Sequence, residues 1–569
     1  MEAPHNFSIA YESAVKIILQ WDSTAAKETM ISEGDSNEID EYLQAVDEIQ
    51  HSMELMSTSE DRSKATSVIQ IAIARLGDEF VNILTCSTNP RYSTSSSSLS
   101  SISLTDTSYY DADYLDYDAP SDEAINHLRS IAERMHSVGH LRQCLQAYRQ
   151  VRKALMELRF RDLGIENLST DDVWELETEV LEGKTKRWIR IAKVCARVLF
   201  PNEKKLCEQI FHDLGIAIQD TYFIETIKDS AIRLFKFAEA ISTGRRSLER
   251  LFSILELHQT MSHLFPDMEV LFQCKASEAI RIPAAEILLR LSLAAKEILW
   301  KFEKAVLDEL SPFPAPGGTI HNLTAFVMKY IIRISVFKRT LVELLESKPS
   351  MDLRYSNDLM IPDLRLMELG ERTPLGLQLI RIVVILQYKL EIKSKEYNDA
   401  PLAHFFMMNN VHYIIQRIEG CPELKNMIGS EYLKQLIGMF GQKVISYQRS
   451  TWLSVLHCLK DDGLVSWVSH PSSRILVREK LKTFYTLFKK VHQTQAAWSV
   501  PDQQLREELR ILISQNLLPM YRTFISRHCN VVSLDRYIKY TCEELEAAAL
   551  DFFKGNQERA LTSNKVRFV

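Results

Sequence analysis

Apolar residues recur three and four positions apart along most of the chain, with polar and charged residues between them. In the first 85 residues the clearest series consists of Ile69, Ile71, Ala72, Leu76, Phe80 and Ile83. This spacing places side chains on one face of an α-helix, whereas one face of a β-strand requires strict alternation. No alternating stretch is long enough for a sheet, so the pattern predicts an all-α protein.

The helical spacing resumes at Asp122, and local motifs indicate where helices begin and end. Ser169-Thr170-Asp171-Asp172 is typical of a capping motif that precedes a helix. Proline cannot donate the backbone hydrogen bond of a helix interior. We therefore expect Phe200-Pro201 to end one helix and Pro283 to lie in the first turn of another. A further apolar helical face consists of Leu481, Phe484, Phe488 and Val491.

The length of the chain, 569 residues, exceeds what one hydrophobic core organises. Gly and Pro number 17 each, about 3% of the residues, whereas average usage is roughly 7% and 5%. Turns are therefore few and helices long. Because consecutive helices joined by short loops pack as antiparallel neighbours, we predict an elongated rod of consecutively stacked antiparallel helical bundles.

The predicted rod divides into five parts. An N-terminal helical region covers residues 1–85, and a linker covers residues 86–121. The N-terminal bundles of the rod cover residues 122–310, and the middle bundles cover residues 311–440. A basic C-terminal helical bundle covers residues 441–569, and we expect it to bind membranes.

The predicted linker is polar throughout. Residues 87–108 are mostly Ser and Thr, and residues 109–123 combine tyrosines with six acidic residues. Such a segment buries too little apolar surface to offset the entropy of ordering it. We predict disorder from about Cys86 to about Ser121, and phosphorylation of the serine run stays open.

Charge is distributed unevenly along the chain. Residues 441–569 contain 19 Lys and Arg against 12 Asp and Glu, a net charge of +7, so the first 440 residues carry the other −14 of a total of −7. Either this is a local fluctuation in composition, or the basic end binds an anionic partner. The basic residues that we consider are Lys482, Lys489, Lys490, Arg506, Arg510, Arg522, Arg527, Arg536 and Lys539.

An anionic membrane is the partner that this basic end favours. Binding phosphate groups requires several Lys or Arg side chains on one surface. Nucleic acid meets the same requirement, but the region lacks a Gly-rich or aromatic stacking platform and the chain is acidic, with a pI near 6.2. We therefore expect no nucleic acid partner, although each basic residue alone is also compatible with a solvated helix face.

The sequence carries no motif of a known catalytic or cofactor site. Glycine-rich phosphate loops, His-Glu-x-x-His, the EF-hand loop and the Gly-x-Ser-x-Gly elbow are absent from it. Ser13-Ala-Val-Lys16 matches a catalytic Ser-x-x-Lys pattern but lacks the companion motifs. The run Phe405-Phe-Met-Met408 suits an adaptable surface or a core, and its helical spacing favours the core. We expect no enzymatic activity, no cofactor and no metal.

The cysteines and the hydropathy indicate the compartment. Nine cysteines are scattered without a Cys-x-x-Cys pair, which favours reduced cytosolic thiols over disulfides or a zinc site. The first residues lack the pattern of a signal peptide. The most apolar stretch, residues 380–386, contains Arg381 and is too short to span a bilayer. We predict a cytoplasmic protein that contacts membranes peripherally.

Several motifs occur in the order found in one protein family. The segment Phe406-Met-Met-Asn-Asn-Val-His-Tyr-Ile-Ile-Gln-Arg417 resembles a signature of the exocyst complex seventy-kilodalton subunit family. The resemblance covers about residues 125 to 555, and its details are similar to the plant branch. The other motifs of the series are Lys186-Arg-Trp-Ile-Arg190, Glu208-Gln-Ile-Phe211, Leu264-Phe-Pro-Asp267, Gly317-Gly-Thr-Ile-His321 with Thr324, Tyr447-Gln-Arg-Ser-Thr-Trp452, Pro519-Met-Tyr-Arg522 and Arg536-Tyr-Ile-Lys-Tyr540.

The resemblance implies a rod of helical bundles whose C-terminal module binds anionic phosphoinositides at the inner plasma membrane. It also implies contacts with other exocyst subunits and with Rho-type GTPases. The family's lipid-binding lysines lie in a Lys-Tyr-Ile-Lys-Tyr stretch, and Arg536 and Lys539 match these lysines here. At position 536 arginine keeps the positive charge of the lysine, but its guanidinium has a different shape and hydrogen-bonding geometry. The supporting candidates are Arg522, Arg527, Lys482, Lys489 and Lys490.

Two functions are compatible with this resemblance. The first is a subunit that tethers secretory vesicles to the plasma membrane in exocytosis. The second is a diverged adaptor that acts outside the core complex, in plant immunity or autophagy-linked traffic, with immune proteins as partners. Co-purification with the other exocyst subunits would separate the two.

Overall fold

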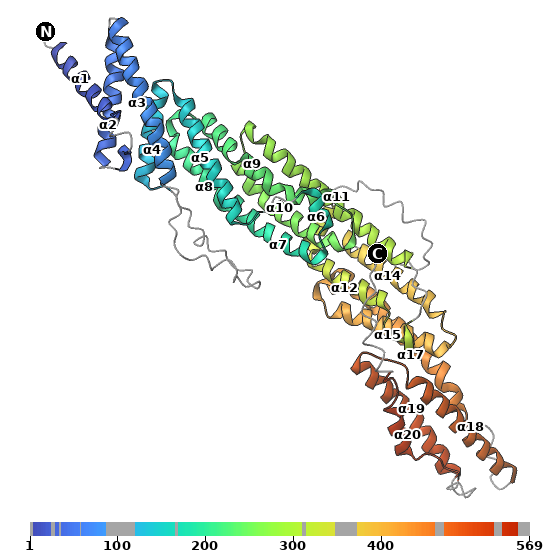
Figure 1. The fold of residues 1–569 in the computed structure, drawn as a ribbon. Coiled ribbons are helices and arrows are strands. Elements are labelled where there is room, and N and C mark those ends of the chain that lie inside the picture. The colour runs from blue at the N-terminus through green and yellow to red at the C-terminus, as the bar shows by residue number, and fades with distance from the viewer. Residues whose placement is uncertain are drawn as a thin grey trace. The chain divides into compact units, whose positions relative to one another are not determined.

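The computed structural model describes residues 4–23, 29–33, 36–56, 59–86, 120–165, 169–309, 315–346, 373–460, 471–528 and 537–555. These residues form α-helices, short 3₁₀ and π segments and no β-strand (Figure 1). The predicted all-α class is therefore confirmed for this part of the chain. We predict disorder from about Cys86 to about Ser121, and residues 87–119 of this linker lie outside the described residues. At its two ends, Cys86 is the last residue of α3 and Ser121 caps α4.

The chain divides into two compact units, Met1–Ala295 and Lys296–Val569, and the division falls inside α11. The predicted division into five parts stays a prediction. The helices of the first unit are α1 (Pro4–Trp21), α2 (Ser36–Leu55), α3 (Ser59–Cys86), α4 (Asp122–Ser137), α5 (Leu141–Asp162), α6 (Thr170–Glu175), α7 (Thr178–Val194), α8 (Phe200–Ile210), α9 (Ile216–Thr243), α10 (Leu251–Leu271) and the first part of α11 (Glu278–Asp308).

The second unit contains the basic C-terminal residues. Its helices are the rest of α11, α12 (Asn322–Val336), α13 (Lys338–Glu346), α14 (Pro374–Ser394), α15 (Ala400–Glu419), α16 (Pro422–Ile428), α17 (Ser430–His457), α18 (Pro471–Gln495), α19 (Gln503–His528) and α20 (Cys542–Ala549). Residue 441, where the basic part begins by charge, lies within α17.

One helix signal in the sequence is confirmed and two are corrected. Ser169 caps α6 as predicted, because its Oγ accepts a hydrogen bond from the Asp172 N–H at 3.1 Å and the Asp172 carboxylate accepts one from the Ser169 N–H at 2.9 Å. The prediction that Phe200-Pro201 ends a helix is wrong. A π-helical turn at Cys195–Leu199 connects α7 to α8, and Pro201 lies in the first turn of α8, where the fixed φ of proline suits the helix.

The prediction for Pro283 is also wrong. Pro283 lies inside α11 rather than in its first turn, because the helix already begins at Glu278. The carbonyl of Ala279 consequently lacks the donor four residues ahead. The remaining length of α11 and its buried face offset this loss.

A buried ion pair joins α5 to α8 in the first unit. Arg152 Nε lies 3.0 Å from Glu203 Oε2, and the Tyr148 hydroxyl donates a hydrogen bond to Glu203 Oε1 at 2.8 Å. The three side chains are at most 1% exposed, so these donors must replace the water that the carboxylate loses. Burial and the neighbouring Glu203 charge raise the pKa of Tyr148, which keeps its hydroxyl protonated.

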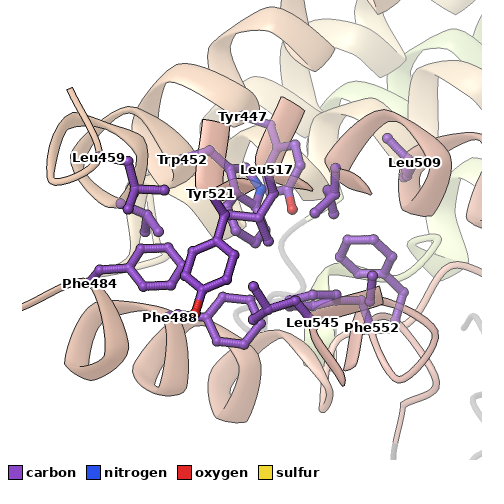
Figure 2. Close-up of a cluster of buried hydrophobic side chains, with 14 of the residues drawn as sticks. Tyr447, Trp452, Leu459, Phe484, Phe488, Leu509, Leu517, Tyr521, Leu545 and Phe552 are labelled. Atoms are coloured by element: carbon purple, nitrogen blue, oxygen red, sulfur yellow. The ribbon is translucent and has the colours of Figure 1, made fainter. Parts of the chain in front are cut away.

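An aromatic core holds α17 to α20 together in the second unit (Figure 2). The rings of Phe484 and Tyr521 stack with their centroids 5.3 Å apart, and the Trp452 and Phe552 rings meet edge to face at 5.7 Å. Leu481, Phe484 and Phe488 are buried, as the predicted face of α18 requires, and Val491 packs against the same core. The run from Phe405 to Met408 is buried in α15, which confirms the core alternative.

Candidate functional site

The signature segment in α15 places two asparagine side chains in the interior of the second unit. Asn410 Oδ1 accepts a hydrogen bond from the His321 N–H at 2.9 Å. Asn409 Nδ2 donates to the Gly318 carbonyl at 2.7 Å and to the Ser499 carbonyl at 3.0 Å. Sequence motifs that lie about 90 residues apart therefore form one hydrogen-bonded cluster, and its role is structural.

Two glycines complete this cluster. Gly317 has φ 64° and Gly318 has φ 68°, in the left-handed region that favours glycine. A Cβ atom at Gly317 would lie 3.0 Å from the Ala497 carbonyl oxygen, and one at Gly318 would lie 2.9 Å from the side chains of Leu402 and Phe405. Only glycine fits both the backbone conformation and the space at these positions.

Hydrogen bonds between tyrosines attach the segment after α19 to α18. The Lys539 N–H donates to the Tyr485 hydroxyl at 3.2 Å, which lies 3.0 Å from the Tyr521 hydroxyl. Tyr521 donates to the Tyr540 carbonyl at 2.7 Å, so its oxygen accepts the Tyr485 proton. Burial and the hydrogen bond with Tyr485 raise the pKa of Tyr521, which keeps the Tyr521 hydroxyl protonated. This chain of bonds fixes the backbone of Lys539 beside α18.

The attached segment adds one cation to a row of cations on α18. Arg478, Lys482 and Lys489 are exposed, and their spacing of four and seven residues places them within about 40° of one another around the helix. Lys539 is also exposed, and its backbone N–H contacts Tyr485 on the adjoining flank of the helix. We call Arg478, Lys482, Lys489 and Lys539 the basic face.

Three of the predicted site residues thus lie together, and one member of the basic face was missed. Lys482, Lys489 and Lys539 are predicted from the sequence, whereas Arg478 is not. Arg478 could have been predicted from its sequence spacing, because it lies four residues before Lys482 and eleven before Lys489 on the same predicted helix. Arg536 lies outside the described residues.

The remaining predicted lysine lies off this face. Lys490 is exposed about 100° around α18 from Lys489. It lies near Asp399. Partial burial raises the pKa of Asp399, and the positive charge of Lys490 makes this rise smaller.

The two predicted arginines of α19 point in different directions. Arg522 and Arg527 are exposed but lie about 140° apart around the helix. The pKa of Glu543 is lowered by a backbone hydrogen bond, by the Thr541 hydroxyl and by the charge of Arg522. Arg527 borders a small depression beside Lys460 and Phe524.

A further arginine considered from the sequence is structural. Arg510 is buried, and its Nε and Nη2 donate to the Phe552 carbonyl at 3.1 and 2.8 Å. Its Nη1 donates to Glu507 at 2.6 Å. Arg510 therefore anchors the last described residues to α19 and is unavailable to a partner.

Two other kinds of site are absent from the part of the chain that the structure describes. Within it, no group of three or more His, Cys, Asp or Glu side chains could hold a metal ion. None of the described helices combines the length and hydropathy that crossing a bilayer requires.

Family models match most of the chain. The model for the C-terminal region of the Exo70 exocyst complex subunit matches residues 186–551, and the model for the N-terminal region of the exocyst complex component Exo70 matches residues 10–86. The chain belongs to the Exo70 family. The resemblance seen in the sequence is thereby confirmed, and the basic face of this family member lies inside the matched C-terminal region.

Relatives from plants agree with this assignment. The chain is 30% identical to Exocyst complex component EXO70A1 of Arabidopsis thaliana over 591 residues, which covers 97% of this chain and 89% of the relative. It is 33% identical to Exocyst complex component EXO70B1 of the same plant over 442 residues, covering 77% of this chain and 68% of the relative. This Exo70 family member is therefore of the plant type.

Solved structures support the fold class. A crystal structure of the Saccharomyces cerevisiae exocyst component Exo70p matches with a TM-score of 0.52 at 14% sequence identity, covering 96% of this chain and 99% of the yeast chain. At this identity the likeness concerns the fold. It agrees with the predicted all-α class of helical bundles.

Proposed function

We propose that this chain is a non-enzymatic exocyst subunit that tethers secretory vesicles to the plasma membrane by binding anionic phosphoinositides through its basic face. Membership in the Exo70 family supports the exocyst as its setting and the other exocyst subunits as partners. Rho-type GTPases are further proposed partners. The proposed location is the cytoplasm, with peripheral attachment to the plasma membrane and vesicles.

The observation that carries the lipid proposal is the gathering of four exposed cations from two separate segments. Lys539 lies 54 residues after Tyr485, yet hydrogen bonding places its backbone beside the row of cations on α18. Each basic group near an anionic membrane surface contributes on the order of 1 kcal/mol. Four such groups on one face bind a polyanionic headgroup much better than the same charges spread over the surface.

Flotation of the full chain with liposomes tests the proposal. The liposomes contain phosphatidylcholine with or without phosphatidylinositol bisphosphate. The variant Lys482→Ala/Lys489→Ala/Lys539→Ala should lose about 3 kcal/mol, or roughly a hundredfold in affinity. A matched control, Lys395→Ala/Lys425→Ala/Lys434→Ala, removes three exposed lysines elsewhere in the second unit and should bind like the wild type.

Two outcomes would contradict the proposal. Equal binding of the wild type to neutral and anionic liposomes would show that attraction between opposite charges does not drive the binding. Equal losses in both triple variants would show that net charge, not the basic face, determines binding. If the chain also failed to co-purify with the other exocyst subunits, an adaptor outside the core complex would be the better function.

A further inference from the structure

Large apolar side chains are exposed to solvent near the amino end of α18, beside the basic face. Ile475 is 61% exposed, Leu476 is 53% exposed, and Tyr537 is 40% exposed. Single apolar side chains on a surface are common, but adjacent ones that border a charged surface indicate a binding site. We call these three residues the apolar tip.

The apolar tip and the basic face adjoin each other. The guanidinium carbon of Arg478 lies 4.2 Å from the centroid of the Tyr537 ring. Ile475 precedes Arg478 by three residues and Lys482 by seven, which places the three side chains within about 60° around α18. Leu476 points about 100° away from Ile475, so it lies at the same end of α18 but off the basic face.

An anionic bilayer fits this combination of groups better than a soluble anion does. A soluble polyanion would engage the cations and leave the aliphatic side chains in water. At a bilayer surface, phosphate groups attract Lys and Arg, while Ile, Leu and Tyr side chains enter the boundary between headgroups and acyl chains. The net charge of +7 in residues 441–569 complements an anionic leaflet.

We infer that the apolar tip inserts into the interfacial region of an anionic membrane while the basic face binds the headgroups. This inference rests on the proposed function. Salt screens exposed charges over about 8–10 Å but does not weaken the burial of apolar groups. Part of the membrane affinity should therefore survive salt, and that part should depend on Ile475 and Leu476.

Flotation at low salt and at about 0.5 M salt separates the two contributions. The full chain is used with phosphatidylcholine vesicles that contain phosphatidylinositol bisphosphate. Partial insertion of two aliphatic side chains is worth on the order of tenfold in affinity. The variant Ile475→Ser/Leu476→Ser should lose about that much at low salt and all binding at high salt.

A matched control removes two apolar side chains of similar exposure elsewhere in the second unit. Ile511 is 54% exposed and Leu550 is 55% exposed. The variant Ile511→Ser/Leu550→Ser should bind like the wild type at both salt concentrations. Circular dichroism of both variants establishes that they are folded.

Fluorescence quenching provides a second readout that reports depth. The variants Ile475→Trp and Ile511→Trp are each mixed with vesicles whose lipids carry bromine on the acyl chains. Insertion of the apolar tip should produce additional quenching in Ile475→Trp and none in Ile511→Trp, above the background of the native tryptophans.

The outcomes distinguish this inference from the proposed function. A wild type that binds no anionic vesicles overturns both. Wild-type binding that salt abolishes completely, with Ile475→Ser/Leu476→Ser unchanged and Ile475→Trp unquenched, overturns the inference and leaves the proposed function. Equal losses in the tip variant and its control also overturn the inference, because the effect would not be local.

Discussion

The buried ion pair of the first unit and the basic face of the second unit use similar side chains in opposite surroundings. Arg152 is 1% exposed and bonded to a carboxylate of its own chain. Lys482, Lys489 and Lys539 are exposed, and none of them forms an ion pair with a carboxylate of the described residues. Arg152 therefore stabilises the interior of the first unit, whereas the three lysines can bind an anionic partner from solution.

The difference follows from the hydration of charge. Removing an ion from water costs several kcal/mol, so a buried cation requires its partner within the same folded chain. An exposed cation keeps its water and contributes about 0–1 kcal/mol to stability even when paired. Substitutions at the buried pair should therefore change stability, whereas substitutions on the basic face should change binding.

The largest effect is expected at the buried ion pair. Arg152→Met leaves the Glu203 carboxylate buried without its main partner, which should destabilise the first unit by about 3–5 kcal/mol. Differential scanning calorimetry of the full chain measures this change. The combined variant Arg152→Met/Glu203→Leu/Tyr148→Phe removes the charges and the hydroxyl together and should recover most of the loss. An unchanged transition in Arg152→Met would contradict the importance of the pair.

A smaller loss is expected from the asparagine cluster. Asn410 Oδ1 accepts hydrogen bonds from the His321 N–H and from the Thr324 hydroxyl, the latter at 2.7 Å. Asn410→Ala leaves both buried donors unpaired and should destabilise the second unit by about 2–4 kcal/mol, measured by the same calorimetry. Gln416→Ala on the same helix removes an exposed hydrogen bond to Asp502 and should change little. Similar effects of the two variants would argue against the cluster.

The next effect concerns binding alone. Arg536→Ala/Lys539→Ala should lower phosphoinositide affinity by about 2 kcal/mol, or roughly thirtyfold, because two cations are lost. Truncation of the exposed Lys539 side chain should keep stability within about 0.5 kcal/mol, as is usual for surface substitutions. Liposome flotation measures the first quantity and thermal unfolding the second. A folded double variant that floats like the wild type would remove these two residues from the site.

The smallest effect links stability to binding. Tyr485→Phe removes the hydroxyl that accepts the Lys539 N–H, which should cost about 1 kcal/mol of stability. The segment that carries Lys539 is then held less firmly, and we expect a loss of a few-fold in phosphoinositide affinity. Tyr388→Phe, at an exposed tyrosine of α14, should change neither quantity. Flotation of the two variants side by side tests whether the tyrosine bonds position Lys539.

Much of the fold could be predicted from local spacing. The apolar series on α3 and α18 predicted these helices correctly, because an amphipathic face depends only on residues that are close together in the sequence. The Ser169–Asp172 capping box also depends on a few adjacent residues. The predictions for Pro201 and Pro283 failed because each depended on where a helix begins or ends, and a few neighbouring residues do not determine that position. A π-helical turn carries the chain past Leu199, and an early start at Glu278 places Pro283 inside α11.

The sequence by itself determined the helical class, the family and the excess of positive charge at one end. Only the tertiary structure decided which basic side chains share a surface. Arg510 is buried because its guanidinium satisfies the Phe552 carbonyl 42 residues away. Lys539 joins the cations of α18 because Tyr485 and Tyr521 hold its segment there. Helical periodicity acts over a few residues, whereas burial and hydrogen bonding between distant segments depend on how the helices pack.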